Sequence, residues 1–508
     1  MKPSRAKTLH PAWLDSLERG PLFLSVRAAL RGTDAYLVGG ALRDAALGRK
    51  GELRDLDLAA PGDAEAFARR LAKRLGGTCF LMHEATQVYR IVPKPGGKGS
   101  APFQVDVARL QGQGILADLG RRDFAANAMA LPCAGGDLLD PFGGLQDLER
   151  RVLRATHDQV FREDPLRLLR AFRIAAQLGL RLDAGTLRRI RKDAPLLKKC
   201  AGERKRMELF ALLSVPAAAP WLHAMDDAGL LAALLPELEP SRACAEVYYG
   251  KGGVLKHSLA VAARMDLLLG DLEAAFGKSA EPIRRELADT EGRPKNLPAL
   301  LRLGALLHDV AKPACAKMLD GRLRFFGHEA EGARMAGKIM DRLRCSRDEA
   351  GWVSAWIVYH LRPGNLASNR IVSDKAVFRF FRDLGPKGVG LLLLCWADHA
   401  SYLTPARLAS VLRWTREDPQ TFDSRKVRDA DTRKTLYHLQ VVSLLLDRWF
   451  HRPETARPVR LLDGVAVMKT LGIPPGPKVG ELLAALQEAQ GEGKVRTRED
   501  ALRYLRSL

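Results

Sequence analysis

Several features that mark other classes of protein are scarce in this sequence of 508 residues. Its seven cysteines are scattered and form no Cys-x-x-Cys pair, which argues against a disulfide framework and against a zinc knuckle. No apolar run approaches the roughly 20 residues that span a bilayer. Residues 1–13 lack the apolar stretch of a signal peptide. We therefore expect a cytoplasmic protein without a membrane segment.

Positive charge, by contrast, is abundant. Lys and Arg number 81 against 59 Asp and Glu, which gives a formal net charge of +22. Such a field attracts a polyanion, with nucleic acid as the first partner to consider and an anionic membrane surface as the second. Hydrophobic residues make up 47% of the chain, an ordinary share that allows large cores to be buried. The length predicts about three or four domains.

The stretch 37–59 combines a glycine turn with two nearby carboxylates. An apolar strand runs into Gly39-Gly40 and a helix start that carries Arg43, so backbone N–H groups and a fixed positive charge can meet a phosphate. Asp55 and Asp57 follow in a strand-like segment, where alternation places both on one face. An isolated Asp-x-Asp is more often a solvated turn. The order and spacing of both elements together favour a two-cation site for phosphoryl or nucleotidyl transfer.

The segments around this stretch read as a mixture of helices and strands. Residues 1–35 are expected to form a lead-in helix, and residues 64–75 an amphipathic helix that Gly76 ends. A Gly/Pro/Lys turn is predicted at 93–102. Strands are predicted at residues 78–82, 87–92 and 103–110. Asp106 in the last strand is a candidate third carboxylate or a support for the first two, and a local strand-end carboxylate is equally consistent with the pattern.

Two arginine-rich segments follow. The Arg-Arg-Asp run at 121–123, taken alone, is consistent with a helix entry that has a solvated first turn. Within residues 161–173, Asp164 is predicted to cap a helix and Pro165 to occupy its first position. Three arginines then recur at every third position, which in isolation indicates an amphipathic helix with a solvated basic face: Arg167, Arg170 and Arg173.

A different group of residues lies between about 240 and 415. His308 and Asp309 are adjacent at the end of an apolar helical pattern, and His257 and Asp398 lie on other helical patterns. A lone histidine is usually a satisfied core or surface residue. Two imidazoles and two carboxylates from three helices, however, can bind a borderline transition metal.

Taken together, these motifs resemble the class II tRNA nucleotidyltransferases and bacterial poly(A) polymerases of the polymerase-β-like superfamily. The matching motifs are Gly-Gly-x-x-Arg-Asp at 39–44, Asp-x-Asp at 55–57, Arg-Arg-Asp-Phe-x-x-Asn-Ala at 121–128, Asp-Pro-Phe-x-Gly at 140–144, and Glu-Asp-x-x-Arg-x-x-Arg-x-x-Arg at 163–173. Ala125-Ala126 departs from the family's Thr-Ile. The pattern H…HD…D formed by His257, His308, Asp309 and Asp398 resembles the HD phosphohydrolase domain.

The resemblance implies an α+β fold in four segments. A polymerase-β-like nucleotidyltransferase head, a small mixed sheet with helices, would be followed by a mostly α-helical neck, an HD domain and a tail that helps grip tRNA. The expected boundaries are 1–155 for the head, 156–238 for the neck, 239–415 for the HD domain and 416–508 for the tail.

The resemblance also implies roles for individual residues. Asp55 and Asp57, with Asp106 as the third candidate, would form the catalytic set, and the first two would bind Mg²⁺. The residues that would hold the triphosphate of ATP or CTP are Gly39, Gly40, Arg43 and Arg122. Those that would read the base or steady the reading helix are Asp164, Arg167, Arg170 and Arg173. The HD ligands for Ni²⁺, Mn²⁺ or another divalent ion would be His257, His308, Asp309 and Asp398, with His328 and His360 as extra ligands or substrate contacts.

The activity expected from this resemblance is template-independent addition of C, A or both to the 3′ end of tRNA. Val107–Gly120 is short where full CCA-adding relatives carry a longer flexible loop, a feature associated with CC-only members. CCA or partial CCA addition is favoured, and poly(A) synthesis ranks third. Two further hypotheses are a binding-only head beside a working HD phosphohydrolase that acts on RNA 3′ phosphates, and a non-catalytic RNA-binding protein. No membrane partner is expected, and the oligomeric state stays open.

Overall fold

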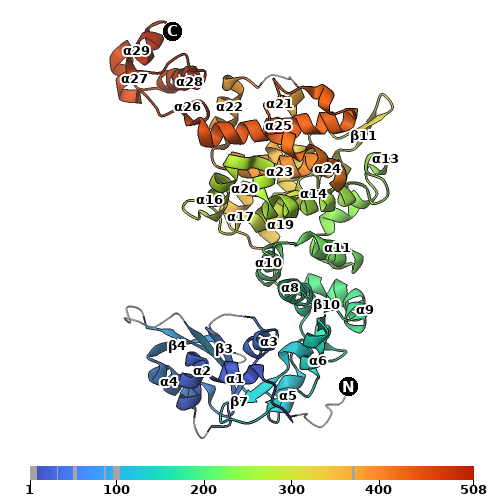
Figure 1. The fold of residues 1–508 in the computed structure, drawn as a ribbon. Coiled ribbons are helices and arrows are strands. Elements are labelled where there is room, and N and C mark those ends of the chain that lie inside the picture. The colour runs from blue at the N-terminus through green and yellow to red at the C-terminus, as the bar shows by residue number, and fades with distance from the viewer. Residues whose placement is uncertain (1–7, 31–32, 50–53, 85–86, 95–102, 369–371) are drawn as a thin grey trace. The chain divides into compact units, whose positions relative to one another are not determined.

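The computed structural model describes residues 8–30, 33–49, 54–84, 87–94, 103–368 and 372–508. Most of the predicted turn at 93–102 lies outside these ranges. The chain divides into two compact units. The N-terminal unit comprises Met1–Cys200 and Ala228–Ala233, and the C-terminal unit comprises Ala201–Asp227 and Leu234–Leu508. A mixed sheet with helices in the first unit and helices almost throughout the second make the fold α+β, as expected (Figure 1).

An eight-stranded sheet in the order β1-β8-β7-β2-β3-β6-β5-β4 organises the N-terminal unit. Its strands are β1 (Thr8–Leu9), β2 (Tyr36–Val38), β3 (Asp55–Ala60), β4 (Gly77–His83), β5 (Val88–Pro93), β6 (Gln104–Arg109), β7 (Ala130–Pro132) and β8 (Leu138–Leu139). β3 and β6 run parallel, and the other neighbours are antiparallel. The strands predicted at 78–82, 87–92 and 103–110 are therefore present as β4, β5 and β6.

The helices of this unit follow their local sequence signals. They are α1 (Trp13–Glu18), α2 (Pro21–Ala29), α3 (Gly40–Ala46), α4 (Ala64–Leu75), α5 (Ile115–Gly120), α6 (Gly144–Glu149), α7 (Val160–Glu163), α8 (Arg167–Leu178) and α9 (Ala184–Asp193). The prediction for α4 is confirmed, because the Asp63 carboxylate accepts a hydrogen bond from the Ala66 N–H and Gly76 ends the helix in the left-handed conformation. The single lead-in helix predicted for 1–35 is wrong, since Pro21 begins a second helix.

Two short strands accompany the helices that follow the sheet. β9 (Val152–Leu153), which precedes α8 in the chain, pairs in parallel with β10 (Arg181–Leu182), which follows α8. One face of α8 is buried through Leu168, Leu169 and Phe172, while its arginines are only partly covered. The prediction of an amphipathic helix in this segment is therefore correct as far as packing is concerned.

The C-terminal unit is a helical bundle. Its helices are α10 (Gly202–Leu213), α11 (Ala219–Asp227), α13 (Glu246–Tyr249), α14 (Gly253–Gly270), α15 (Leu272–Phe276), α16 (Ala280–Ala288), α17 (Leu297–Leu307), α18 (Lys312–Cys315), α19 (His328–Arg342), α20 (Arg347–Tyr359), α21 (Arg362–Ser368), α22 (Asp374–Leu384), α23 (Lys387–Ser401), α24 (Pro405–Val411), α25 (Ala430–His451), α26 (Pro453–Ala456), α27 (Gly464–Leu471), α28 (Pro477–Gly491) and α29 (Arg498–Arg506). Helix α12 (Leu230–Leu234) lies across the boundary between the two units, and β11 (Lys317–Leu319) with β12 (Arg322–Arg324) forms a hairpin.

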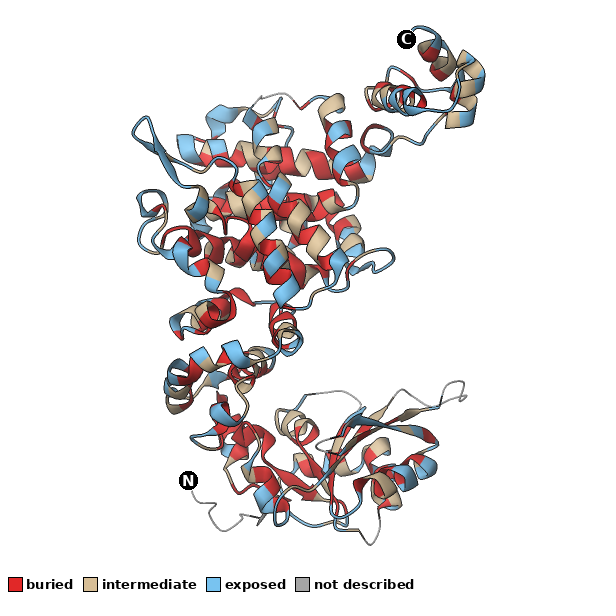
Figure 2. Ribbon diagram, turned by 180° about the vertical axis from the view of Figure 1, so that it is seen from behind, coloured by how far each residue is buried: buried red, intermediate tan, exposed pale blue. Residues whose placement is uncertain are grey.

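Helices α14, α17 and α23 pack against one another, and α20 packs against α17 and α23, which buries the centre of this bundle (Figure 2). Trp356 of α20 is fully buried there, and its indole N–H donates to the Lys387 carbonyl at 3.0 Å. Gly304 on α17 and Gly390 on α23 make room for it, since a Cβ at Gly390 would lie 2.5 Å from the indole ring. Close helix packing of this kind fixes side chains that point between the helices.

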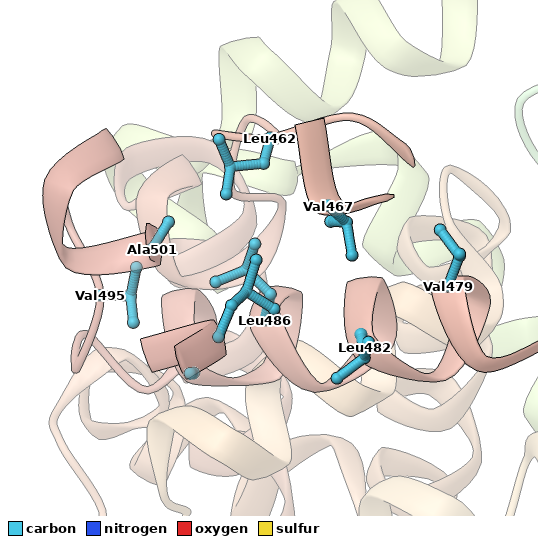
Figure 3. Close-up of a cluster of buried hydrophobic side chains, with 9 residues drawn as sticks. Leu462, Val467, Val479, Leu482, Leu486, Val495 and Ala501 are labelled. Atoms are coloured by element: carbon cyan, nitrogen blue, oxygen red, sulfur yellow. The ribbon is translucent and has the colours of Figure 1, made fainter. Parts of the chain in front are cut away.

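The last three helices have a small core of their own. Leu462, Val467, Leu486 and Ala501 are among its buried side chains (Figure 3). Lys375 of α22 forms ion pairs with Glu488 of α28 and with Glu492, which follows α28, and so connects α22 to these helices. Among the described residues, no helix combines the length and apolarity that crossing a membrane requires.

Candidate active site and metal centre

The glycine turn and the two aspartates meet at the end of β2. Val38, its last residue, is the register partner of Asp57 on β3, and Gly39 leads directly into α3. Gly39 has φ +77°, and a Cβ at this position would lie 2.8 Å from Asp57 Oδ2. The backbone of Gly40 makes a hydrogen bond to the Asp57 carboxylate. Glycine is thus required here both for its conformation and for the closeness of the carboxylate.

Asp55, Asp57 and Asp106 form what we call the carboxylate row. Asp55 and Asp57 lie on one face of β3, opposite the buried Leu56 and Leu58, as alternation predicted. Asp106 is the register partner of Asp57 on the parallel strand β6. Burial raises the pKa of Asp57 to about 6, helped by the neighbouring charges of Asp55 and Asp106. Three clustered carboxylates that repel one another suit a divalent cation.

Each member of the carboxylate row also has a partner within the protein. Gln104 Nε2 lies 3.2 Å from Asp55 Oδ1. Arg90 on β5 binds Asp106 in bidentate fashion, with Nε 2.8 Å from Oδ1 and NH2 2.7 Å from Oδ2. Sequence reasoning missed Arg90, because only the strand order and register place it opposite Asp106.

Arg122 lies beside the same turn. Its NH1 atom would lie 3.6 Å from a Cβ placed at Gly39. Its positive charge opposes the rise in the pKa of Asp57 that burial causes. The buried carboxylate of Asp118 holds it through bonds of 3.2 and 3.0 Å, and also binds Arg121. Burial alone would raise the pKa of Asp118, but the guanidinium groups of Arg122 and Arg121 outweigh it and keep that pKa below its usual value. Arg122 is therefore fixed before any ligand arrives.

A chain of polar contacts connects the glycine turn with α8. Arg43 NH1 donates to Asn127 Oδ1 at 2.7 Å, and Asn127 Nδ2 donates to Asp123 Oδ1 at 2.9 Å. Arg170 Nε then donates to the other oxygen of Asp123 at 2.9 Å. Burial opposes the charge of Asp123, yet Arg170 and Asn127 hold its pKa below the usual value. Asp123 and Asn127 belong to a motif found in the sequence, but no local pattern predicted that they link these two segments.

The other residues proposed to read the base lie at the start of α8. Asp164 does not cap the first residue of the helix, which begins at Arg167; its carboxylate instead accepts from the Leu166 N–H at 3.2 Å, in the turn that Pro165 forms. The cap position is thus displaced by two residues, from Asp164 to Leu166. Arg167 NH2 donates to the Arg121 carbonyl at 2.9 Å. One turn beyond Arg170, Arg173 donates to Gln177 at 2.8 Å.

The second constellation is the histidine cluster, defined by six residues from the bundle: His257, His308, Asp309, His328, His360 and Asp398. His257 on α14 approaches both carboxylates, with Nε2 3.5 Å from Asp309 Oδ2 and 3.1 Å from Asp398 Oδ1. His308 Nε2 lies 3.2 Å from Asp309 Oδ2 and 3.8 Å from Asp398 Oδ1. The structure therefore brings the four predicted HD ligands together.

His328 and His360 extend the cluster on the other side of Asp309. Their Nε2 atoms lie 3.4 and 3.7 Å from Asp309 Oδ1, and 3.3 Å from each other. Among the described residues, two groups of three potential ligands have all ligand atoms within 4.8 Å of one another, and Asp309 belongs to both: His257, His308 and Asp309, and Asp309, His328 and His360. The carboxylate of Asp309 is thus placed to be shared.

The donor atoms of the histidine cluster fit a metal ion. In the part of the chain that the structure describes, the buried atoms without hydrogen-bonding geometry to any partner include His257 Nε2, His308 Nε2, both oxygens of Asp309 and Asp398 Oδ1. Three rings are oriented by backbone carbonyls at their Nδ1 atoms: His308 by Ala305, His328 by Phe325 and His360 by Ile357. That arrangement turns Nε2 inward and is typical of metal-binding histidines.

Electrostatics favours the ligand form of His360, Asp309 and Asp398. Burial lowers the pKa of His360 to about 4, so its imidazole is neutral at neutral pH. Burial alone would raise the pKa of Asp309, but His308 and Lys312 outweigh it and hold that pKa well below its usual value. Lys312 Nζ lies 2.6 Å from Asp309 Oδ2 and 2.9 Å from the Tyr249 hydroxyl. Neutral imidazoles and ionised carboxylates are the forms that bind metals.

A pocket of about 640 Å³ opens beside the second group of ligands. Strand β12 of the hairpin, Tyr249 and Lys312 line it together with His328. The hydroxyl of Tyr248 donates to the Leu323 carbonyl at 3.0 Å and so joins α13 to the hairpin. Sequence reasoning did not anticipate this pocket, because the hairpin carries no motif.

Comparison with known proteins agrees with the order of these features. The chain matches a family model described as the poly A polymerase head domain over residues 35–154. A model described as the probable RNA and SrmB-binding site of polymerase A matches residues 179–241, and the HD domain model matches residues 254–433.

Relatives of similar length span nearly the whole chain. A CC-adding tRNA nucleotidyltransferase of Geobacter sulfurreducens is 34% identical over 490 residues, covering 96% of this chain and 94% of that protein. An A-adding tRNA nucleotidyltransferase of Deinococcus radiodurans is 33% identical over 482 residues, covering 93% and 94%. In fold, the chain resembles the Thermotoga maritima CCA-adding enzyme complexed with tRNA, with a TM-score of 0.63, 19% identity and 99% of each chain covered. The chain therefore belongs to the family of tRNA nucleotidyltransferases.

Proposed function

We propose that this protein is a template-independent nucleotidyltransferase that adds C, A or both to the 3′ end of tRNA. The observation that carries the proposal is the position of Asp57, which faces the Gly39-Gly40 turn with Arg122 beside it. The names of the full-length relatives support tRNA as the acceptor. The formal charge of +22 suits a polyanionic substrate.

In the reaction, the 3′-hydroxyl oxygen of the RNA attacks the α-phosphate of CTP or ATP. A new P–O bond forms, the bond between the α- and β-phosphates breaks, and pyrophosphate leaves. Bound Mg²⁺ would supply activation of the hydroxyl and neutralisation of the leaving pyrophosphate. Asp55 and Asp57 would hold the cations. Gly40, Arg43 and Arg122 would hold the triphosphate, so that catalysis is mainly positioning and charge neutralisation.

The base would be read by protein side chains rather than by a template. Asp164 offers a carboxylate acceptor and Arg167 offers guanidinium donors, which together can match the edge of a base. Both lie at the start of α8, next to the backbone of Arg121. Arg170 would position this helix through its pair with Asp123.

Within the family, we favour CC addition. The connection from β6, which ends at Arg109, to α5, which begins at Ile115, is only a few residues long. The full-length relatives named as CC-adding enzymes, including that of Geobacter sulfurreducens, point the same way. A-only addition, complete CCA addition and poly(A) synthesis are the competing outcomes.

The test is a ladder of products from defined acceptors. tRNA transcripts that end at the base before CCA, after the first C, or after CC are incubated with CTP, ATP or both. CC addition predicts that CTP completes the CC sequence on the first two acceptors and that ATP extends none of the three. Extension by ATP alone after CC would indicate A addition, and long A tails would indicate a poly(A) polymerase. No incorporation with any acceptor would contradict the proposed function.

We propose phosphoester hydrolysis as a second activity, located at the histidine cluster. Its support is the set of buried metal-ligand atoms that make no hydrogen bond, beside a pocket lined by Lys312 and His328. Ni²⁺, Mn²⁺ or another divalent ion would supply an activated water there. Release of phosphate from an RNA 3′ phosphate, or cleavage of a generic phosphodiester, is measured with each ion. Asp398→Asn should abolish hydrolysis and leave tRNA extension intact; hydrolysis that survives this change would contradict the assignment.

The segment boundaries at 155, 238 and 415 also stay a proposal, supported by the order of the three family models. We further infer a cytoplasmic location, because tRNA is the proposed substrate.

A further inference from the structure

Arg90 faces the carboxylate row from β5, the strand next to β6. It is the register partner of Asp106, and its guanidinium donates to both oxygens of that carboxylate, at 2.8 and 2.7 Å. The side chains are 28% and 17% exposed, so water screens this pair only in part. The charge of Arg90 also acts on Asp55 and Asp57.

We propose that Arg90 is a positioning residue of the cation site: it holds Asp106 as a charge-neutral pair, so that Asp55 and Asp57 alone supply carboxylate ligands. This inference rests on the proposed function of the head. It assigns Asp106 the role of a fixed partner of Arg90 rather than that of a third ligand.

The geometry of the pair is the first argument. A bidentate guanidinium occupies both oxygens of a carboxylate in one plane. For Asp106 to bind a cation as well, it would have to give up at least one of these hydrogen bonds and leave a partly buried guanidinium beside a divalent ion.

Charge is the second argument. Three free carboxylates carry a charge of −3, which would bind a divalent cation tightly even without substrate. Arg90 reduces this charge to −2, and the charge of Arg122 also acts on Asp57. A triphosphate then supplies the remaining negative charge, so cations and nucleotide are bound together. Arg90 thereby makes tight cation binding dependent on the nucleotide.

A charge cycle tests the proposal. Arg90→Gln, Asp106→Asn and the double variant are prepared as full-length chains, and Mn²⁺ binding without nucleotide is followed by the electron paramagnetic resonance signal of free Mn²⁺. The histidine cluster also binds Mn²⁺ in this scheme. The difference in bound Mn²⁺ between the unchanged protein and Asp57→Ala therefore measures the Mn²⁺ bound at the carboxylate row.

The proposal predicts opposite effects of the two single changes. Arg90→Gln should tighten Mn²⁺ binding about tenfold, because a positive charge near the ion is lost, and Asp106→Asn should weaken it by about the same factor. The double variant restores the net charge and should return to within about threefold of the unchanged protein. The Mg²⁺ concentration that gives half-maximal tRNA extension should shift in the same directions.

Two results would overturn the proposal. If Asp106 is itself a ligand, the double variant stays as weak as Asp106→Asn. If the charge of Arg90 does not affect a cation bound at the carboxylate row, Arg90→Gln leaves Mn²⁺ binding unchanged. Arg90→Lys keeps the charge but cannot occupy both oxygens of Asp106, so its Mn²⁺ affinity should lie between that of the unchanged protein and that of Arg90→Gln. A purely structural role would not give this partial rescue. Arg69→Gln removes the same charge from an exposed pair on α4 and should have no effect.

Folding and function are checked separately. Thermal unfolding verifies each variant, and if Arg90→Gln does not fold, the cycle is repeated with Arg90→Met, which keeps an apolar stem of similar length. The unchanged protein is assayed for tRNA extension in the same preparation. If the unchanged protein extends tRNA but the variants do not show the predicted Mn²⁺ affinities, only the role of Arg90 is refuted. If the unchanged protein does not extend tRNA, the proposed function is refuted.

Discussion

The carboxylate row and the histidine cluster both gather metal-ligand groups, but they do so in opposite surroundings. In the row, each carboxylate has a protein partner, and Asp55 at its outer end is exposed. In the cluster, ligand atoms from three helices and from the ends of two others are buried, and several have no hydrogen-bonding partner in the described structure. A site of the first kind can bind and release cations with a substrate. In a site of the second kind, a metal ion would satisfy the buried ligand atoms.

The largest expected effect separates the two sites by activity. Asp57→Ala should reduce tRNA extension on the order of 10³-fold, comparable to the loss of a major electrostatic group in an active site. Binding of tRNA should survive, because the basic surface is unchanged. Primer-extension rates and a filter-binding assay measure the two quantities. Lost tRNA binding with intact extension would reverse the assignment, and metal content at the histidine cluster should stay constant as a control.

The second effect separates the sites by stability. Asp309→Asn removes the carboxylate shared by both ligand groups, so bound metal should fall to none in elemental analysis. The free energy of unfolding should fall by about 3–5 kcal/mol, the usual cost of removing one member of a buried charged group. Extension of tRNA should change little. Glu281→Gln, a change in an exposed pair with Arg284 and Arg285, serves as the matched control. Unchanged metal content would exclude Asp309 as a ligand.

The third effect concerns pH in the absence of cations. The pKa of Asp57 in the folded protein is about 6, above its usual value of 3.8. Between these values the folded state binds more protons than the unfolded state, so this group stabilises the fold at low pH and loses that contribution as pH rises from about 4 to 6. Thermal unfolding of the metal-free protein with and without added Mg²⁺ measures the change. Asp57→Asn should remove the part of the pH dependence of stability that comes from Asp57, and also the increase in stability that Mg²⁺ causes. If Mg²⁺ still stabilises this variant, the ion binds elsewhere.

The smallest effect tests how finely the carboxylate row is tuned. Gln104→Ala removes one exposed hydrogen bond from Asp55 and should change Mn²⁺ binding or extension by at most about fivefold, since such a bond contributes about 1 kcal/mol. Titration with Mn²⁺ measures the change. A loss as large as that of Asp57→Ala would mean that Gln104 contacts the ions or the substrate directly.

Local patterns predicted the parts of the structure that depend on near neighbours. The helix at 64–75 has its cap, its apolar stripe and its terminal glycine within a dozen residues, and it was found with the correct ends. Strand alternation likewise placed Asp55 and Asp57 on one face. At Asp164 the pattern was less reliable, because the turn formed by Pro165 and Leu166 delays the start of α8. Helix ends depend on such turns, which propensity does not resolve.

Contacts between distant segments could not be read in this way. Nothing near Asp106 in the sequence shows that Arg90 lies across from it, because strand order and register bring the two together. The same holds for Asn127 between Arg43 and Asp123, and for His328 and His360 on the far side of Asp309. These histidines were noticed, but only helix packing could decide that they share a carboxylate with His257 and His308.

By itself, the sequence determined the kinds of chemical group in this protein, their order along the chain, and the local turns and faces that carry them. Only the tertiary structure decided which groups face one another: Arg90 with Asp106, Asp123 with Arg170, and four imidazoles around Asp309. The physical reason is that capping and periodicity act over a few residues. Pairing of charges and ligands depends instead on the register of strands and the packing of helices that are far apart in the chain.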